Sequence, residues 1–202
     1  MATATQLERH LSGHAQRRGP LDALDEGRRR FLRGDRLDMG DLAADLGISR
    51  ATLYRWVGDR ERLLGEILWS FAQRGLAESR AHADGRRLAG ADWVVAYVAH
   101  NMRLTASFEP IKRFMEREPD AALRVLTSKH GVQQSRLIDA LRAVLEEKGA
   151  AGELALPIDP ADLAYAIVRI SESFIWREFI TGEEPDLDKA VQVVRLLLAG
   201  CA

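Results

Sequence analysis

Apolar residues recur along the chain at intervals of three or four positions, which is the spacing of one buried face of a helix. Strand-like alternation of apolar and polar residues does not occur, so we predict an all-α chain. Capping residues, Pro and Gly divide the pattern into helices near residues 20–33, 39–46, 49–56, 59–83, 92–104, 111–117, 119–145 (with or without a break near Gly131), 159–181 and 187–198. We expect Asp92 to cap the fifth of these helices, and Asp159 with Pro160 to open the eighth.

The most specific pattern covers residues 39–64 and reads MGDLAADLGISRATLYRWVGDRERLL. Gly47 can adopt the left-handed turn conformation that a residue with a Cβ resists. Ser49 is a favourable N-cap for the helix that follows. Two short helices joined in this way form a helix-turn-helix, which places its second helix in a DNA major groove.

This segment resembles the TetR family of bacterial transcription regulators. The resemblance covers Asp41–Leu64, above all the runs SRATLY from residue 49 and DRE from residue 59. Two positions depart from the family pattern, because Met39 stands where a hydroxyl residue often caps the helix and Ala51 stands where Gly is frequent. The resemblance implies an all-α fold of about nine helices, with an N-terminal three-helix helix-turn-helix domain, a C-terminal helical bundle and a two-fold dimer.

The resemblance also implies which residues contact DNA. Thr52, Tyr54 and Arg60 would bind phosphates, although Tyr54 could instead pack beneath the following helix. Arg50 and Arg55 are the best candidates for base-edge contacts, because Arg pairs bidentately with guanine. The expected DNA-binding residues are Ser49, Arg50, Ala51, Thr52, Tyr54, Arg55 and Arg60.

The net charge of −1 hides a gradient along the chain, because residues 1–62 hold 12 Arg against 10 acidic residues. We expect three parts: a flexible N-terminal arm (1–18), a DNA-binding domain (19–64) whose helix from residue 59 links onward, and an effector-binding and dimerisation domain (65–202). Arg17 and Arg18 belong to a disordered tail or reach an adjacent minor groove. The three Arg at 28–30 form a solvated helix face or add attraction to the DNA backbone.

One helix-turn-helix reads few base pairs, and a two-fold dimer presents two of them. The last two predicted helices carry apolar stripes suited to a dimer contact, namely Ile167, Ile170, Phe174, Val191, Val194, Leu197 and Leu198. The alternative is that both stripes face the core of their own subunit.

Charged residues interrupt the apolar stretch AIVRISESFIWREFI, which begins at Ala166. The spacing puts Tyr165, Arg169, Glu172 and Trp176 on one helical face. Because burying an unpaired charge is costly, this face holds an Arg169–Glu172 pair or a salt bridge across the dimer, or it lines a pocket for a mostly hydrophobic effector. The expected pocket residues are Trp93, Tyr97, His100, Asn101, Phe114, Tyr165, Arg169, Glu172, Phe174 and Trp176.

TetR-like regulators commonly hold such a pocket, and the run FIWREFITGEEPDLDKAVQVVRLLL is similar to the branch that regulates degradation of quorum-signal lactones. The resemblance therefore implies a ligand-responsive repressor that binds a palindromic operator as a dimer and is released by a lactone, fatty acid or acyl compound. Its partners would be double-stranded DNA, a second copy of the chain and a small hydrophobic or amphipathic ligand.

Other functional classes find little support in the sequence. The five His show no metal-ligand spacing, and HExxH, GxSxG and P-loop motifs are missing, so we expect no catalytic site, metal or cofactor. Cys201 is the single cysteine, and neither an apolar run of about 18 residues nor a signal peptide occurs, so we expect a cytoplasmic protein. The alternative function is that of a ligand-independent architectural protein that binds DNA with tolerance for sequence.

Overall fold

The computed structural model describes residues 18–127 and 132–201, and every regular element within these ranges is helical, so the all-α prediction is confirmed. The elements are α2 (Pro20–Arg33), α3 (Met39–Asp45), α4 (Arg50–Val57), α5 (Arg60–Gly85), α6 (Gly90–Ser107), α7 (Glu109–Arg117), α8 (Pro119–Thr127), α9 (Val132–Ala150), α10 (Pro160–Ile175), α11 (Arg177–Thr181), α12 (Leu187–Leu198) and the short 3-10 helix η1 (Ala199–Cys201). None of these described helices combines the length and the apolar composition needed to cross a membrane.

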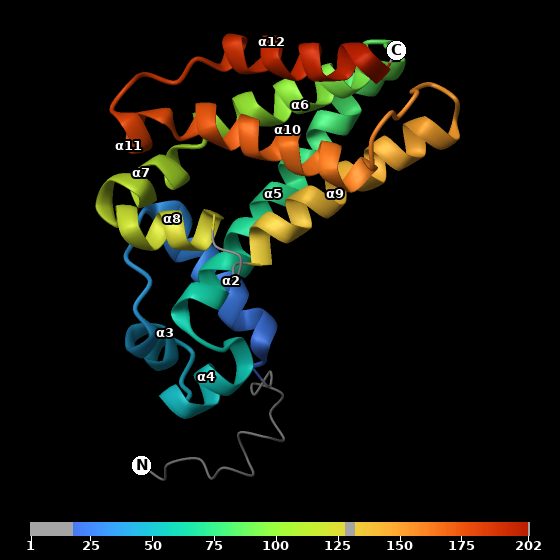
Figure 1. Cartoon of the computed structure of the whole chain (residues 1–202). Coiled ribbons are helices and arrows are strands. Elements are labelled where there is room, and N and C mark those ends of the chain that lie inside the picture. The colour runs from blue at the N-terminus through green and yellow to red at the C-terminus, as the bar shows by residue number, and fades with distance from the viewer. Residues whose placement is uncertain (1–17, 128–131, 202) are drawn as a thin grey trace, which may run out of the picture.

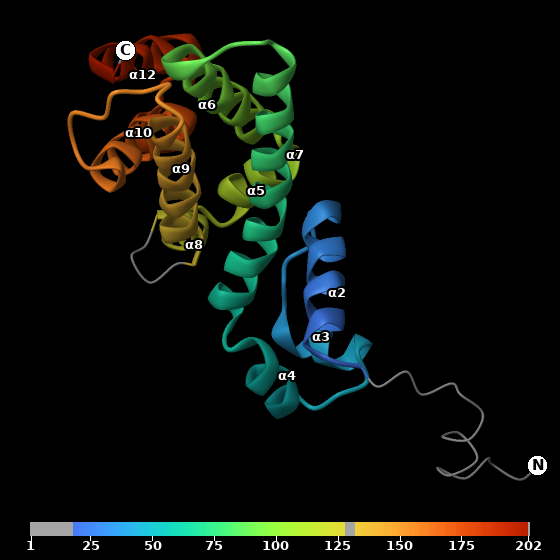
Figure 2. The same ribbon diagram turned by 90° about the vertical axis from the view of Figure 1, so that its right-hand side faces the viewer.

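Helices α2, α3 and α4 form a small group at one end of the molecule, which we call the helix-turn-helix unit (Figure 1). The longest helix, α5, starts at this unit and runs away from it into a larger bundle (Figure 2). In the bundle α5 packs on α6 and α9, while α10 contacts both α9 and α12. Helix α7 contacts α2, so the bundle touches the helix-turn-helix unit at a second place besides α5.

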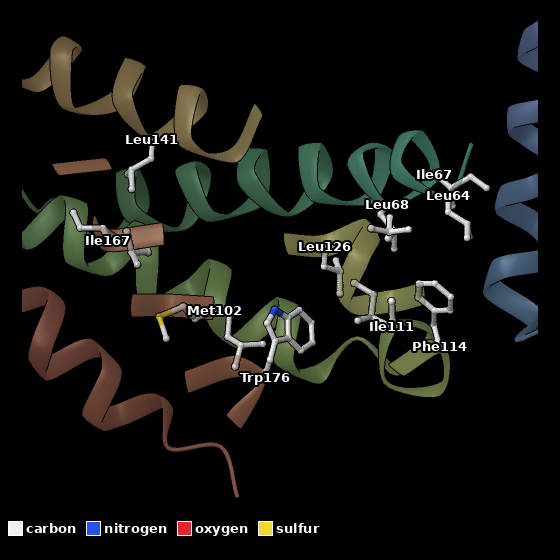
Figure 3. Packing of buried hydrophobic residues seen from close by; sticks show 14 of the residues in the cluster. Leu64, Ile67, Leu68, Met102, Ile111, Phe114, Leu126, Leu141, Ile167 and Trp176 are labelled. Carbon is white, nitrogen blue, oxygen red and sulfur yellow. The ribbon is translucent and has the colours of Figure 1, made fainter. Parts of the chain in front are cut away.

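The helix-turn-helix unit is packed directly onto α5 and α7. A Cβ at Gly27 of α2 would lie 2.8 Å from Cδ1 of Ile67, so the glycine leaves room for this buried side chain of α5. Phe31 of α2 meets Phe114 of α7 edge to face, with ring centroids 5.6 Å apart. Figure 3 shows side chains of α5, α6, α7, α8, α9 and α10 in one apolar interior, so the described helices share a continuous core.

The helix predicted over residues 159–181 is two helices in the structure. Helix α10 ends at Ile175, Trp176 has φ −96° and ψ 14°, and α11 follows. Neither Pro nor Gly marks this break, and the buried Trp176 continues the apolar spacing, so the pattern could not reveal it. With α8 and α9 also separate, the described residues hold eleven α-helices, more than the nine or so expected. The sequence left open whether the helix breaks near Gly131, and this position lies outside the described residues.

The start of α6 also differs from the prediction. Ala89 stands at the N-cap and no side chain caps the helix, whereas Asp92 lies in the first turn and pairs with Arg195 of α12. Asp92 therefore joins two helices instead of capping one. Asp159 caps α10 as predicted.

Candidate nucleic-acid interface and apolar pocket

The turn between α3 and α4 is fixed by backbone hydrogen bonds. Gly47 adopts φ +64°, which confirms the left-handed conformation predicted for it. The N–H groups of Gly47 and Ile48 donate to the carbonyl oxygens of Ala44 and Ala43, each at 3.0 Å. This arrangement satisfies the last carbonyl groups of α3 and reverses the chain toward α4.

Asp38 caps α3, one residue before the position at which a hydroxyl residue is common in the family. Its Oδ1 accepts the N–H groups of Asp41 at 3.0 Å and Gly40 at 2.6 Å. Both bonds lower the pKa of the Asp38 carboxyl below its ordinary value, and the bond from Asp41 has the larger effect. Met39 is buried in the core, which gives a physical reason for an apolar residue at this position.

Ser49 caps α4 as predicted, because its Oγ accepts the N–H of Thr52 at 3.1 Å. Leu53 is the fully buried residue of α4, so the opposite side of the helix faces solvent. Tyr54 is 48% exposed and does not pack beneath α5. Six of the seven expected DNA-binding residues lie on α4 or at its cap, with Thr52 half-buried and the others exposed: Ser49, Arg50, Ala51, Thr52, Tyr54 and Arg55.

The Arg50 guanidinium extends from α4 over the start of α3. A Cβ at Gly40 would clash with this guanidinium, so the glycine provides the space that it occupies. Arg50 remains exposed, and its charge lies close enough to Asp38 to contribute to the low pKa of that carboxyl. A cation is thus held where the two helices of the motif meet.

The side chain of Arg60, the seventh expected DNA contact, is used inside the protein. Its Nε donates to the carbonyl oxygen of Leu37 at 2.7 Å, and its Nη2 lies 2.8 Å from both carboxylate oxygens of Glu118. Glu118 lies between α7 and α8, and its side chain is 13% exposed. This pair joins the start of α5 to the bundle, so in this structure the guanidinium of Arg60 is engaged by protein groups.

The three Arg at 28–30 have different environments. Arg30 is buried and pairs with Asp45 of α3 and with Glu26, the latter at 3.5 Å. The side chain of Arg29 is 65% exposed and lies 2.8 Å from Glu26. Arg30 therefore stabilises the helix-turn-helix unit, and Arg29 belongs to a solvated face.

Two further Arg lie near the ends of the motif. Arg18 donates from Nη1 to the carbonyl oxygen of Asp45 at 2.6 Å, whereas Arg17 lies outside the described residues. Arg62 is beside Gly58, and its side chain is 73% exposed. Sequence reasoning did not single out Arg62, although it lies only two residues after Arg60 on the first turn of α5.

A cavity of about 380 Å³ lies within the bundle, bordered by α5, α6, α7, α8, α9 and α10 and, at Leu32, by α2. Its wall is mostly apolar and includes Phe71, Phe108, Met102, Ile167 and Trp176, of which the last three are labelled in Figure 3. Small-molecule sites typically enclose about 300–1,000 Å³ with such a wall. Across the described part of the chain, no group of three or more His, Cys, Asp or Glu is arranged to hold a metal.

Two polar side chains in the cavity wall, Glu172 and Gln133, are buried away from water. Glu172 is 9% exposed, and its Oε2 accepts from Nη1 of Arg169 at 2.8 Å and from Nε2 of Gln134 at 3.2 Å. Burial raises the pKa of Glu172 to about 7, against the opposing effect of Arg169. Gln133 is 6% exposed, and its buried Oε1 has no hydrogen-bond partner among the described residues.

Four of the ten expected pocket residues line the cavity: Tyr97, Asn101, Glu172 and Trp176. Burial raises the pKa of Tyr97 to about 12, so its hydroxyl stays protonated. The predicted Arg169–Glu172 pair is present, and Glu172 also borders the cavity. This face of α10 can therefore hold the ion pair and border the cavity at the same time.

The other six expected pocket residues lie elsewhere: Trp93, His100, Phe114, Tyr165, Arg169 and Phe174. Trp93 donates to Asp84 at 2.8 Å, and the ring of His100 stacks on that of His82 at 4.1 Å. Tyr165 is 55% exposed. Helical spacing identified the right helices, but it could not fix how far each face is rotated toward the cavity.

The expected dimer residues also divide into two groups. Ile167, Val194 and Leu198 are at most 1% exposed, so they belong to the core of their own subunit and cannot add area to a dimer contact. The remaining four are half-buried or exposed: Ile170, Phe174, Val191 and Leu197. The most exposed apolar side chains of α10 and α12 are Tyr165 at 55% and Leu196 at 75%, which the stripes did not include.

Helix α7 touches both the cavity and the helix-turn-helix unit. Ile111 near its start lines the cavity. At its end Arg117 donates to the carbonyl oxygens of Gly34 and Asp35, the latter at 3.1 Å, and Glu118 holds Arg60. A change in the position of α7 would therefore also move the loop between α2 and α3 and the start of α5.

Comparison with known proteins agrees with this geometry. A family model described as the tetracyclin repressor-like C-terminal domain matches residues 89–199, whereas no curated protein sequence matches the chain. Among solved structures, the TetR-family transcriptional repressor QsdR from R. erythropolis is 28% identical with a TM-score of 0.82, over 89% of this chain and 94% of that one.

Two more distant structures share the fold. The TetR-family repressor AlkX from Dietzia sp., implicated in biodegradation of n-alkanes, is 22% identical with a TM-score of 0.62, over 92% of this chain and 98% of that one. The transcriptional regulator FadR from Bacillus subtilis, solved in complex with stearoyl-CoA, is 14% identical with a TM-score of 0.55, over 89% and 98% of the two chains.

Proposed function

Because the chain belongs to the TetR family of transcriptional regulators, we propose that it is a repressor that binds a palindromic operator as a dimer and is released by a small, largely hydrophobic effector. Regulators of this family are DNA-binding proteins without enzymatic activity, and they typically respond to ligands. The observation that carries the proposal is the largely apolar cavity of about 380 Å³ in a bundle that one long helix joins to an exposed helix-turn-helix.

In this proposal residues 19–64 bind DNA, and residues 65–202 bind the effector and form the dimer. Arg50 and Arg55 contact base edges, because they are exposed on the side of α4 opposite the buried Leu53. The phosphate contacts come from Ser49, Thr52 and Tyr54, from Arg62, and from the backbone N–H groups at the start of α5.

The dimer forms through the exposed sides of α10 and α12. Exposed or half-buried apolar side chains occur on both helices: Tyr165, Ile170, Phe174, Val191, Leu196 and Leu197. Large apolar side chains left open to water on two adjacent helices support a protein contact there. Two copies joined in this way present two α4 helices to one face of the duplex.

The effector is a lactone, a fatty acid or another acyl compound. The mostly apolar wall of the cavity supports a ligand with a long apolar part. AlkX is implicated in n-alkane biodegradation and FadR was solved with stearoyl-CoA, but both share only the fold with this chain. The cavity itself is therefore the main support.

Release from DNA requires the effector to bind the DNA-incompetent arrangement better than the competent one. We assign the transmission to α7 and the Glu118–Arg60 pair, because α7 lines the cavity at Ile111 and holds the helix-turn-helix unit at its other end. A ligand that displaces α7 would shift the start of α5 and change the spacing of the two α4 helices.

A competition titration tests the DNA side of the proposal. The full chain is bound to a fluorescent duplex selected from a random pool and then challenged with bulk genomic DNA or with the unlabelled selected duplex. A repressor releases the label at a far lower concentration of the selected duplex, typically by about 10³-fold or more. Equal competition by both DNAs would instead support an architectural protein that binds without sequence preference.

A further inference from the structure

The polar end of the cavity offers hydrogen-bond acceptors without donors. Arg169 and Gln134 both donate to Oε2 of Glu172, and no donor among the described residues bonds Oε1. The orphaned Oε1 of Gln133 lies on the neighbouring helix α9 and lines the same cavity. The Gln133 oxygen is a buried acceptor without a partner, which is costly, so a ligand that supplies the missing donor gains binding free energy there.

Among the described residues, the charge of Glu172 is balanced by one cation. Arg169 is paired with it on α10, but Arg169 does not line the cavity, so its guanidinium is not presented to a ligand. The other charged side chains of the cavity wall, Arg74 and Glu78 of α5, are exposed and have opposite signs. A charged group placed beside Glu172 would therefore add an uncompensated buried charge.

Resting on the proposed function, we infer that the cavity selects an effector with an apolar chain and an uncharged polar end that donates a hydrogen bond, such as a hydroxyl or an amide N–H. An ionised fatty acid would place a second carboxylate next to Glu172, and a protonated amine would leave a net positive charge beside the Arg169–Glu172 pair. Within the effector classes proposed above, this selects acyl compounds that carry a hydroxyl or an amide N–H, because a simple lactone, an ester or an ether has no donor and would leave the acceptors of Glu172 and Gln133 unsatisfied.

Isomeric probes test this inference without knowledge of the natural effector. 1-Octanol and heptyl methyl ether have the same atoms and nearly the same length, but only the alcohol donates a hydrogen bond. We would measure the binding of both, and of octanoate and octylammonium, to the full chain by calorimetry at about pH 8.5, where Glu172 is ionised. The alcohol should bind at least about tenfold more tightly than the ether, because its hydroxyl donates to a charged acceptor. Both ions should bind more weakly than the alcohol.

Three variants locate the effect. In Glu172→Gln the preference for alcohol over ether should shrink to about twofold or reverse, because Arg169 then bonds the amide oxygen and the amide N–H₂ takes the place of the acceptor. Glu146→Gln makes the same chemical change on an exposed residue of α9 that does not line the cavity, and it should keep the preference. Gln133→Leu removes the orphaned acceptor and should also reduce the preference, which keeps the test decisive if Glu172→Gln does not fold.

The outcomes separate the two proposals. Equal binding of alcohol and ether, or tightest binding of either ion, would overturn the inference while leaving the cavity as an effector site. An alcohol preference that survives both Glu172→Gln and Gln133→Leu would also overturn it. If none of the four probes binds, the cavity is not a site for amphipathic ligands, and the proposed mode of release is lost together with this inference.

Discussion

Glu172 is a carboxyl that burial removes from the environment of a surface side chain. Its folded pKa of about 7 lies above the ordinary 4.5, so between these values the folded chain holds the proton more tightly than the unfolded chain does. Its contribution to stability is therefore fully present below about pH 4.5 and is lost as the pH rises through about 7. Arg169 on its own helix, Tyr97 of α6, and Arg74 and Glu78 of α5 are the titratable groups that share this pair or the cavity wall.

Glu172→Gln should therefore change stability in a pH-dependent way. The free energy of unfolding of the variant, relative to wild type, should increase by up to about 3 kcal/mol between about pH 5 and pH 8.5, because Gln avoids the cost of a buried charge. Urea titrations at both pH values measure the difference. Gln133→Leu serves as the control, since the amide that it removes does not titrate. A difference that does not depend on pH would show that Glu172 is ionised without penalty.

Arg50→Ala tests base reading by a single side chain. We expect a loss of about 1–3 kcal/mol in binding to the selected duplex, together with relaxed preference at one base position. Binding to a panel of single-base variants of that duplex measures both quantities. Arg103→Ala, on the distant helix α6, should leave affinity and preference unchanged. An equal loss on every sequence would identify Arg50 as a phosphate contact.

Local patterns predicted single residues well where the cause is local. The cap at Ser49 and the turn at Gly47 depend on neighbours within a few positions, and both are confirmed. The Glu118–Arg60 pair joins residues 58 positions apart, and the orphaned oxygen of Gln133 depends on helices packed around it. Neither leaves a trace in periodicity or spacing, so both were missed.

At the scale of the element, the N-cap residue of α4 affects the stability of the helix and the affinity for DNA, and two substitutions separate these effects. Ser49→Ala should lower the free energy of unfolding by about 1 kcal/mol, because the N–H of Thr52 loses its acceptor. Ser49→Asp should keep the cap and the stability but weaken DNA binding by about tenfold or more, since it adds a negative charge beside phosphates. Chemical unfolding and DNA titration of the two variants separate these effects. Unchanged DNA affinity in Ser49→Asp would place the start of α4 away from the duplex.

The contact between α7 and α5 can be tested in the same way. Glu118→Ala leaves the half-buried Arg60 without its carboxylate and should cost about 1–3 kcal/mol of stability. Amide hydrogen exchange in the loop between α2 and α3 should also become faster, because Arg117 and Glu118 hold that region together. Glu109→Ala, an exposed partner of Lys112, should stay within about 0.5 kcal/mol of wild type. Unchanged exchange in Glu118→Ala would exclude this route of transmission.

Helix positions were largely predictable, but helix breaks were not. The apolar spacing and the caps located α2, α4, α7 and α12 closely. The spacing continues through Trp176, where the backbone leaves the helix because of tertiary packing, and so one helix was predicted instead of α10 and α11. The same limit applies to the stripes on α10 and α12, whose inward and outward sides only the packed bundle distinguishes.

At the scale of the whole molecule, the exposed sides of α10 and α12 define the proposed dimer. Leu196→Arg combined with Tyr165→Arg should convert a dimer into a monomer, because both side chains are exposed in the subunit and would face the partner. Sedimentation velocity measures the mass of the species. Ile158→Arg, at a residue that is 52% exposed between α9 and α10, is the matched control and should leave the dimer intact. A double variant that remains dimeric would place the contact elsewhere.

The central claim is that two copies of the chain insert their α4 helices into one face of a DNA duplex. Hydroxyl-radical footprinting of the full chain on its selected duplex measures this directly. The account predicts two symmetric patches of protection, spaced by about one helical turn or a small multiple of it. In Arg50→Ala, the protection at the centre of each patch should become weaker. A single patch, or uniform protection along the duplex, would contradict it.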